Sequence, residues 1–419
     1  MAQVSEAELT RLEASPVAEV DIDPAISSAG ARGVATATAR TRAERVSDLV
    51  SRLRFPFAVY LGTRLVLIVV GLFDSAVFHY SLATELSNWD GVWYLRVATR
   101  WYPTVALHGK STLGFFPLYP MVLWAVGHTL FIPLTLGGLI ISGIGGFVAV
   151  VLVRRLAVLW WGEQVAKKAV VWFCLFPGSV VFSMVYSEGL LIPLAAGCLL
   201  ALHHKRWVLA GVLAGIATAV GPNGLVLIAV CAVAVIRVAK HHGARSTETR
   251  QSLPALVIAP AGFVGFCAFL WAHTGTPLAF FWAQRNGWGE QTEPLALLHQ
   301  AQYLAQEISF TNFDIHLIDW NLVSGLLGAA FLAVGIFLLF RRRADVPPEA
   351  LVWVLGIAFL TVTSEHVPPN PRMLITAFPA LLVYTRYLSG RGYWVLLGVG
   401  TTLLLVMSGM TYVGYGLRP

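Results

Sequence analysis

The sequence LTLGGLIISGIGGFVAVVLV, from Leu134 to Val153, indicates the fold of this chain: it holds no charged residue, and Arg154 and Arg155 follow it directly. Twenty helical residues are about 30 Å long, which is the thickness of the hydrocarbon core of a bilayer. Similar apolar stretches occupy residues 56–80, 115–131, 168–186, 188–204, 207–220, 223–239, 253–273, 321–340, 350–364, 372–388 and 393–413. The pattern predicts a polytopic membrane protein built of helices.

The composition agrees with this class. Of the 419 residues, 57% are hydrophobic and 12% are charged, whereas soluble domains carry about 25% charged residues. We therefore expect an all-α transmembrane bundle of about 10 to 12 spans. The net charge of +7 does not indicate nucleic acid, because the basic residues lie between apolar stretches. The four cysteines all lie inside apolar stretches, where thiols act as small apolar side chains, so neither a disulfide nor a metal site is expected.

The basic residues also predict the orientation, because short cytoplasmic loops are enriched in Lys and Arg. Residues 1–50 are polar and end in a basic segment, which predicts a disordered cytoplasmic tail before a membrane domain at 51–419. The expected outer segments are the loops 81–114 and 274–320 and the turns near 186–188, 222–223 and 364–371. Residues 115–153 contain two apolar stretches where the orientation allows one crossing, so one of them is expected to be re-entrant or interfacial. Arginine outnumbers lysine 24 to 5, which points to a bacterial plasma membrane.

The first outer loop carries the candidate carboxylate Asp90. From Trp89 onward, aromatic and aliphatic residues including Trp93 and Tyr94 recur at helical spacing. This predicts an amphipathic helix in the membrane interface, a depth that Trp and Tyr prefer. Asp90 stands at the start of that helix, where a carboxylate commonly caps free N–H groups. The sequence leaves two roles open for Asp90, a helix cap and a catalytic base.

Two further outer turns carry polar residues. Glu188 follows Tyr186 and Ser187 at the start of an apolar stretch; an acid there is favoured by the helix dipole, but at the edge of an apolar bundle it is also a candidate site residue. Asn223 lies in Gly221-Pro222-Asn223-Gly224, between two short apolar stretches. This predicts a broken helix, and either a structural turn or an anion site.

The last two segments lie in the loop 274–320 and the turn 364–371. Gln284 and Arg285 belong to an aromatic-rich stretch, and such residues suit sugars and lipid headgroups equally. Arg372 follows Pro371 at the outer start of an apolar stretch. An outer arginine departs from the positive-inside bias; its forked guanidinium suits a phosphate, although long basic side chains at helix ends also snorkel to the interface.

Six strings in these segments together resemble the PIG-V-type mannosyltransferases, membrane glycosyltransferases of the GT-C fold class. They are WDG-x-WY (Trp89 to Tyr94), FFPLYP (Phe115 to Pro120), FP-x-S followed by YSE (Phe176 to Glu188), PNG (Pro222 to Gly224), AQ-xx-GW (Ala283 to Trp288) and PR followed by AFP (Pro371 to Pro379). They stand in the family order over residues 56 to 390. One departure is Gly221, where the family usually has an arginine before its PNG.

The resemblance implies an inverting transfer of mannose from a polyprenyl-phosphate-mannose donor on the extracytoplasmic face. Asp90 and Glu188 are then the catalytic candidates. Arg372, Asn223, Gln284 and Arg285 are expected to bind the donor phosphate, and Trp89, Trp93, Tyr94 and Tyr186 the sugar or acceptor. The acceptor would be a hydroxyl of a glycolipid, a lipoglycan or a protein. A lipid phosphate is already a good leaving group, and no DxD motif lies near the candidates, so no metal or other cofactor is expected.

Two other functions remain open at this point. A polyprenyl-lipid or glycolipid transporter or flippase would also need many spans and a broken helix. Transporters, however, often have repeated halves and charged residues at mid-membrane, whereas the unusual polar residues here lie in outer loops and no clear repeat is found. The other function is that of a non-catalytic subunit of a glycosyltransferase complex. One observation favours it: Gly221 stands where the family usually has an arginine.

Overall fold

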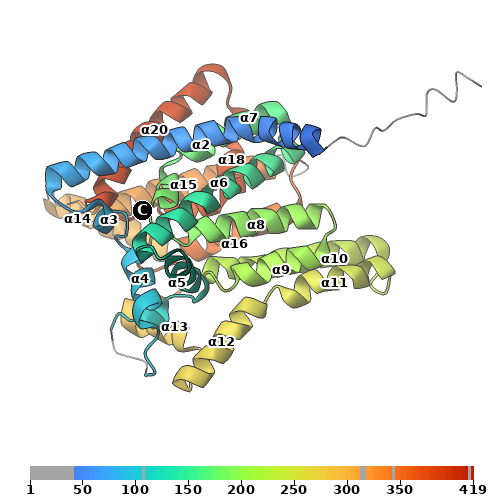
Figure 1. Cartoon of the computed structure of the whole chain (residues 1–419), viewed down its shortest axis with the longest axis horizontal. Helices are drawn as coiled ribbons and strands as arrows, with labels where there is room; N and C mark the ends of the chain where they lie inside the picture. Colours follow the sequence, from blue (N-terminus) through green and yellow to red (C-terminus); the bar gives the residue numbers. More distant parts are fainter. Residues whose placement is uncertain (1–41, 106–108, 312–317, 342–344, 414–416) are drawn as a thin grey trace, which may run out of the picture. The chain divides into compact units, whose positions relative to one another are not determined.

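The computed structural model describes residues 42–105, 109–311, 318–341, 345–413 and 417–419 (Figure 1). Most of the expected tail, residues 1–41, lies outside the described residues, and helix α2 (Arg42–Phe78) begins directly after it. The chain divides into two compact units, Met1–Arg52 and Leu53–Pro419. All contacts discussed below lie within the second unit.

The described part of the chain is helical almost throughout. Its longer helices are α2, α6 (Leu134–Trp161), α7 (Glu163–Leu175), α8 (Glu188–His203), α10 (Val226–His242), α12 (Ala261–Thr274), α14 (Ala296–Thr311), α15 (Trp320–Arg341), α16 (Pro348–Val362) and α20 (Gly390–Tyr412). Shorter helices are α3 (Leu82–Glu85), α4 (Asp90–Arg100), α5 (Leu118–Leu130), α9 (Trp207–Ala217), α11 (Thr247–Ile258), α13 (Ala279–Ala283), α17 (Pro371–Thr376), α18 (Phe378–Leu382) and α19 (Tyr384–Tyr387). Among these residues the one β-type contact is an isolated bridge between Thr292 and Ser364, so the all-α prediction is confirmed.

Six helical segments of the described chain are long and apolar enough to cross a membrane: 50–78, 134–161, 222–242, 247–274, 320–341 and 390–412. The bent pair formed by α7 and the 3₁₀ segment η3 (Pro177–Ser183) raises the number to seven, and α8, α9 and α16 are apolar but shorter. The expected 10 to 12 apolar stretches are therefore not all full-length helices. In residues 115–153, the 28-residue α6 meets the length requirement, whereas the 13-residue α5 is only about 20 Å long and too short to cross the hydrocarbon core.

The apolar stretch 168–186 is broken at Phe176, which the sequence analysis did not anticipate. Phe176 is extended because the following Pro177 disfavours helical geometry at the residue before it, and η3 leaves α7 at 70°. The break frees backbone carbonyls, and the buried Arg64 of α2 binds them. Its Nη1 donates to Ser179 O at 2.5 Å and its Nη2 donates to Cys174 O at 3.4 Å. Irregular backbone inside a membrane bundle is thus satisfied by protein.

Small residues bring the central helices close together. Helices α8, α9, α10 and α11 lie side by side, with α6 against α8 and α16 against α10 (Figure 1). Where α6 crosses the start of α8, a Cβ atom on Gly145 would overlap the carbonyl of Gly189. Close backbone contact through small residues is a common way for membrane helices to associate. This contact also fixes the position of the first turn of α8, which begins with Glu188, against α6.

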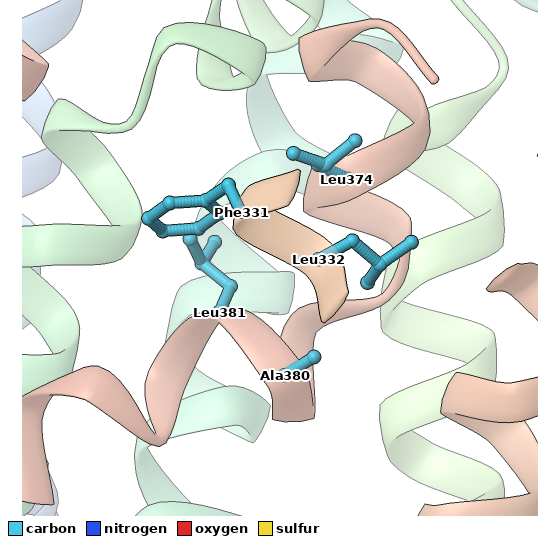
Figure 2. A pocket seen from close by; sticks show the side chains of 5 residues that line it. All are labelled: Phe331, Leu332, Leu374, Ala380 and Leu381. Carbon is cyan, nitrogen blue, oxygen red and sulfur yellow. The ribbon is translucent and has the colours of Figure 1, made fainter. Parts of the chain in front are cut away.

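Helix α17 is seated on an apolar floor (Figure 2). There the side chains of Phe331 and Leu332 from α15 meet Leu374 from α17 and Ala380 and Leu381 from α18. Leu374 is buried, with 5% of its surface exposed, and it follows Arg372 by two residues. The floor therefore anchors the short helix whose first turn carries Arg372.

Candidate active site

Helix α4 presents Asp90 at its first position. Its buried residues Gly91, Tyr94, Val97 and Ala98 follow helical spacing, and Arg96, Thr99 and Arg100 are exposed, so the predicted amphipathic helix is present. The N-cap is Trp89, whose φ of 62° lies in a region that bulky residues rarely adopt. Trp89 is held there by its Nε1, which donates to Thr411 O at 3.3 Å. The Asp90 carboxylate therefore does not take the N-cap position and is directed elsewhere.

Arg372 joins the two candidate carboxylates. Its Nη1 donates to Asp90 Oδ2 in a short ion pair, and its Nε lies 3.5 Å from Glu188 Oε1. The side chain of Arg372 is 13% exposed, that of Glu188 6% and that of Asp90 30%. Glu188 Oε2 is buried without a hydrogen-bond partner. Three side chains from three separate segments thus form one cluster with a net charge of −1, and Asp90 is its most accessible member.

Two buried tyrosines line this cluster. The Tyr186 hydroxyl accepts a hydrogen bond from Asp90 N at 3.3 Å, and the Arg372 guanidinium lies 5.2 Å from the Tyr186 ring centre. The Tyr94 hydroxyl pairs with Ser187 Oγ at 2.9 Å. Burial raises the pKa of Tyr94 well above its usual value, and the Asp90 and Glu188 carboxylates raise it further. Both carboxylates also raise the pKa of Arg372, more than offsetting its burial, so both side chains keep their protons at neutral pH.

The position of Arg372 depends on Gly178. A Cβ atom on Gly178 would overlap the Pro371 carbonyl oxygen, so η3 and the start of α17 are in backbone contact. Gly178→Ala is expected to destabilise the protein by about 1–3 kcal/mol, because this contact is backbone and cannot yield as a flexible side chain would. The thermal unfolding midpoint of detergent-purified protein measures the effect. Gly221→Ala is the matched control: no atom lies within 4 Å of the added Cβ, and an unchanged midpoint is expected. Equal midpoints for both variants would contradict the packing argument.

Gln284 and Trp93 belong to an aromatic cluster next to the carboxylates. The Trp93 ring stacks on Phe115 with centroids 5.8 Å apart and meets Trp288 edge-on at 4.8 Å. Gln284 Nε2 donates to Gly114 O at 2.9 Å, so its amide holds this loop rather than facing the carboxylates. Trp93 follows Asp90 by three residues and so lies on the same side of α4. The motif from Ala283 to Trp288 is therefore joined to the motif from Trp89 to Tyr94 through the loop that precedes α5.

Two of the predicted site residues, Asn223 and Arg285, form no hydrogen bond or ion pair with Asp90, Glu188 or Arg372 in the described part of the chain. Asn223, in the 3₁₀ segment η4 (Pro222–Leu225), donates through Nδ2 to Met373 Sδ at 3.8 Å, next to Arg372 in the sequence. Arg285 is exposed on the segment Gln284–Trp288. The helix break expected near Gly221 is present, because α9 ends at Ala217 and α10 begins at Val226.

Sequence reasoning did not find Asp74 and Glu85. Both are buried, with 6% and 1% of their surface exposed, and they lie on α2 and α3, ahead of α4. Asp74 could have been found as the one acid within the apolar stretch 56–80. No group of three or more His, Cys, Asp or Glu side chains that could hold a metal occurs in the described part of the chain. Asp90 and Glu188 share Arg372 as their ion-pair partner.

Both the sequence and the fold are similar to those of known proteins. Residues 65–272 match the family described as mannosyltransferase (PIG-V), and no curated protein sequence matches the chain. Among solved structures, the Archaeoglobus fulgidus oligosaccharyltransferase in the apo form is similar with a TM-score of 0.42 and 12% identity, over 87% of this chain and 56% of that one. Its complex with an inhibitory peptide and a dolichol-phosphate gives 0.41 and 11%, over 86% and 56%. The chain thus spans little more than half the length of these structures.

Four of the six motifs, from Trp89 to Gly224, lie within the matched residues. Asp90 and Glu188 lie there too, whereas Arg372 lies beyond the match and reaches both through the tertiary structure. The expected resemblance to the PIG-V mannosyltransferases is confirmed over residues 65–272, about half of the chain. With six helices of the described residues long and apolar enough to cross a membrane, the chain is a multi-pass membrane protein that carries the region conserved in these mannosyltransferases.

Proposed function

We propose that the protein is an inverting mannosyltransferase that moves mannose from polyprenyl-phosphate-mannose to a hydroxyl acceptor on the extracytoplasmic face of the membrane. The observation that carries this proposal is the cluster of Asp90, Glu188 and Arg372. It joins one half-exposed carboxylate with a buried carboxylate and a buried guanidinium, and it is bordered by aromatic rings of the kind that bind sugars.

Asp90 is assigned the role of general base. In an inverting transfer the acceptor hydroxyl attacks the anomeric carbon from the side opposite the phosphate, and its proton passes to a carboxylate as the new bond forms. The carboxylate that receives it must be ionised and accessible. Asp90 is paired with Arg372, and 30% of its side chain is exposed. Glu188, with 6% exposed, is assigned to hold Arg372 in place. The phosphate leaves as an anion and needs no acid, unlike the leaving group of a glycosidase.

The donor phosphate requires positive charge that Arg372 does not supply alone, because both carboxylates already face it. Basic side chains border the aromatic cluster of Trp93, Phe115 and Trp288. The Arg96 guanidinium lies 4.5 Å from the Trp93 ring centre, and Lys110 Nζ lies 5.2 Å from that of Trp288. Arg285 is exposed on the same segment as Trp288. We assign the phosphate to this basic rim and the mannose ring to the space between it and Asp90.

The polyprenyl chain is assigned to a groove of about 610 Å³ between the C-terminal end of α4 and the turn that joins α5 to α6. Its lining is mostly apolar and includes Ala98, Trp124, Phe131 and Leu134. At 1.5 Å of rise per residue, Ala98 lies about 12 Å along α4 from Asp90. A lipid held there would have its head near the candidate base.

The pairing of loops supports the extracytoplasmic assignment. Expected outer segments contact one another: Asp90 with Arg372, and Ser364 Oγ with Glu290 Oε1 at 2.7 Å. Expected inner segments do the same: Arg237 Nη2 lies 3.0 Å from Glu349 Oε1. Each group of loops behaves as one end of the bundle, as the positive-inside rule requires.

The test is transfer of labelled mannose from polyprenyl-phosphate-mannose in membranes that contain the protein. Glycolipid, lipoglycan and peptide fractions are supplied as acceptors, and membranes without the protein are the control. Labelled product that depends on the protein supports the proposal. Product from a nucleotide sugar instead would contradict the donor, and protease-protected product inside right-side-out vesicles would contradict the face.

Gly221 keeps the non-catalytic subunit as a second candidate, and it also provides the means to test it. The backbone of Gly221 is extended, with φ 178°, and no atom lies within 4 Å of an added Cβ, so Gly221→Arg is expected to fold as wild type. If the wild type transfers mannose, we expect Gly221→Arg to keep that activity. A wild type without transfer and an active Gly221→Arg would show that the arginine is required, and the natural chain would then be the subunit.

A further inference from the structure

A second polar cluster lies at the end of α20 and shares no residue with the candidate active site. It consists of Asp74 on α2, Glu85 on α3 and the hydroxyls of Ser408, Thr411 and Tyr412 on α20. Asp74 and Glu85 are 6% and 1% exposed, and the three α20 residues are fully buried. Asp74 Oδ2, both Glu85 oxygens and all three hydroxyls have no hydrogen-bond partner. Buried polar atoms are nearly always paired, so six unpaired oxygens on three neighbouring segments require an explanation.

The two helices bring these oxygens to one interface. A Cβ atom on Gly409 would lie 3.5 Å from Asp74 Oδ2, and one on Gly71 would lie 3.7 Å from the Tyr412 ring. Gly71 and Asp74 are one turn apart on α2, as are Gly409 and Tyr412 on α20, so each pair shares a helix face. The glycines let the Asp74 carboxylate and the Tyr412 ring approach the opposite backbone. Helix α3, which ends at Glu85, meets the same interface, because a Cβ atom on Gly71 would lie 2.9 Å from the Leu82 side chain.

Among the described residues, neither Asp74 nor Glu85 forms an ion pair. The nearest basic residue along α2, Arg64, precedes Asp74 by ten residues, about 15 Å of helix, and donates its Nη hydrogens to Cys174, Ser179 and Ser183. Two buried carboxylates without a counter-ion are unfavourable, and a bound cation would remove that cost.

We propose that Asp74, Glu85 and the hydroxyls of Ser408, Thr411 and Tyr412 bind a hard divalent cation such as Ca²⁺ or Mg²⁺. Every candidate ligand is an oxygen, and two carboxylates cancel the charge of +2; both features suit these ions, with water completing the shell. Neither nitrogen nor sulfur is offered, so Zn²⁺ and Cu²⁺ fit poorly. The site is independent of the proposed transfer reaction.

A bound ion would stabilise the contact between three segments of the fold. It would join α2, α3 and the end of α20, and α20 holds the turn that leads into α4. Asn88 Nδ2 donates to Tyr412 O at 2.7 Å, and Trp89 Nε1 donates to Thr411 O at 3.3 Å. An ion bound by Tyr412 would therefore brace Trp89, whose strained backbone aims Asp90 at Arg372.

The test uses Tb³⁺, a luminescent substitute for Ca²⁺, on the full chain purified in detergent and treated with chelator. Excitation of tryptophan, with Trp89 beside the site, is expected to give saturable Tb³⁺ luminescence that Ca²⁺ displaces. Asp74→Asn and Glu85→Gln are expected to weaken binding by about tenfold or more, since affinity depends on the number of charged ligands. Glu293→Gln removes an outer-loop carboxylate that accepts from Leu295 N, and it is expected to bind as wild type. Absence of binding to the wild type, or equal binding to all variants, overturns the proposal.

Two further measurements separate the ion site from the transfer reaction and from a folding defect. Asp90→Asn is expected to keep Tb³⁺ binding even where transfer is lost, so failure of the proposed reaction and failure of the ion site are distinguishable. If Asp74→Asn does not fold, the thermal unfolding midpoint of the wild type decides, because a ligand that binds only the folded state raises it. A higher midpoint in Ca²⁺ or Mg²⁺ than in chelator, with no such rise for Glu85→Gln, supports the site. The same midpoint in both conditions, or the same rise in Glu85→Gln, overturns it.

Discussion

Asp90→Asn is expected to lower the rate of mannosyl transfer by about 100- to 10,000-fold, the usual contribution of a general base. The asparagine side chain has the same shape but cannot accept the proton of the acceptor hydroxyl. It also removes the negative charge that Arg372 Nη1 contacts. The measurement is the initial rate of transfer from labelled polyprenyl-phosphate-mannose at equal amounts of folded protein.

Two comparison variants make this result specific. Asp319→Asn changes an exposed aspartate, outside the cluster, whose Oδ1 accepts a hydrogen bond from Asn321 Nδ2, and it is expected to transfer at the wild-type rate. Glu188→Gln is expected to reduce transfer less than Asp90→Asn, since 6% of the Glu188 side chain is exposed against 30% for Asp90. Unchanged transfer in Asp90→Asn together with a lost rate in Glu188→Gln would assign the base to Glu188 instead.

Arg372→Gln is expected to produce the largest loss of stability, about 3–5 kcal/mol, because removing one partner of a buried ion pair leaves the other charges uncompensated. Here two carboxylates lose the same partner, and Glu188 is the more deeply buried of the two. A lower thermal unfolding midpoint in detergent, and little or no transfer by the protein that remains folded, are the expected observations.

Arg372→Lys tests whether stability depends on the positive charge at this position or on the planar shape of the guanidinium. Lysine keeps the positive charge but lacks the planar fork that reaches two carboxylates at once, so an intermediate midpoint is expected. Arg285→Gln is the matched control on an exposed outer arginine, and its midpoint is expected to stay at the wild-type value. If Arg372→Gln were as stable as Arg285→Gln, the ion-pair cluster would not form in the membrane, and Arg372 would instead be a snorkelling side chain.

The membrane class, the positions of the apolar helices and the amphipathic helix from Asp90 could be predicted from the sequence. These features depend on local hydropathy and spacing, which are properties of neighbouring residues. The same reasoning identified Asp90, Glu188 and Arg372 one by one, because a charged residue at the end of an apolar stretch is unusual wherever that stretch packs. It could not assign a role to Asp90, since a cap and a base require the same residue at the same helix position.

Hydropathy did not predict the bend at Phe176 or the short length of α5. Residues 169–186 contain no charged residue, and their break depends on Pro177 and on the carbonyl oxygens that Arg64 binds from another helix. Likewise, the apolar stretches 115–131 and 134–153 look alike in hydropathy, but α5 is 13 residues long and α6 is 28.

The sequence alone determined that the chain lies in a membrane, that it carries the motifs of its family, and which polar residues lie in the expected outer loops. The tertiary structure alone decided which of those residues meet. Asp90 and Arg372 are 282 residues apart, and they are joined because Gly178 lets η3 contact Pro371 and Gly145 lets α6 contact Gly189. Asp74 and Glu85 likewise became a site only through the packing of α2 on α20. Such contacts depend on backbone approach between distant segments, which no local pattern of residues records.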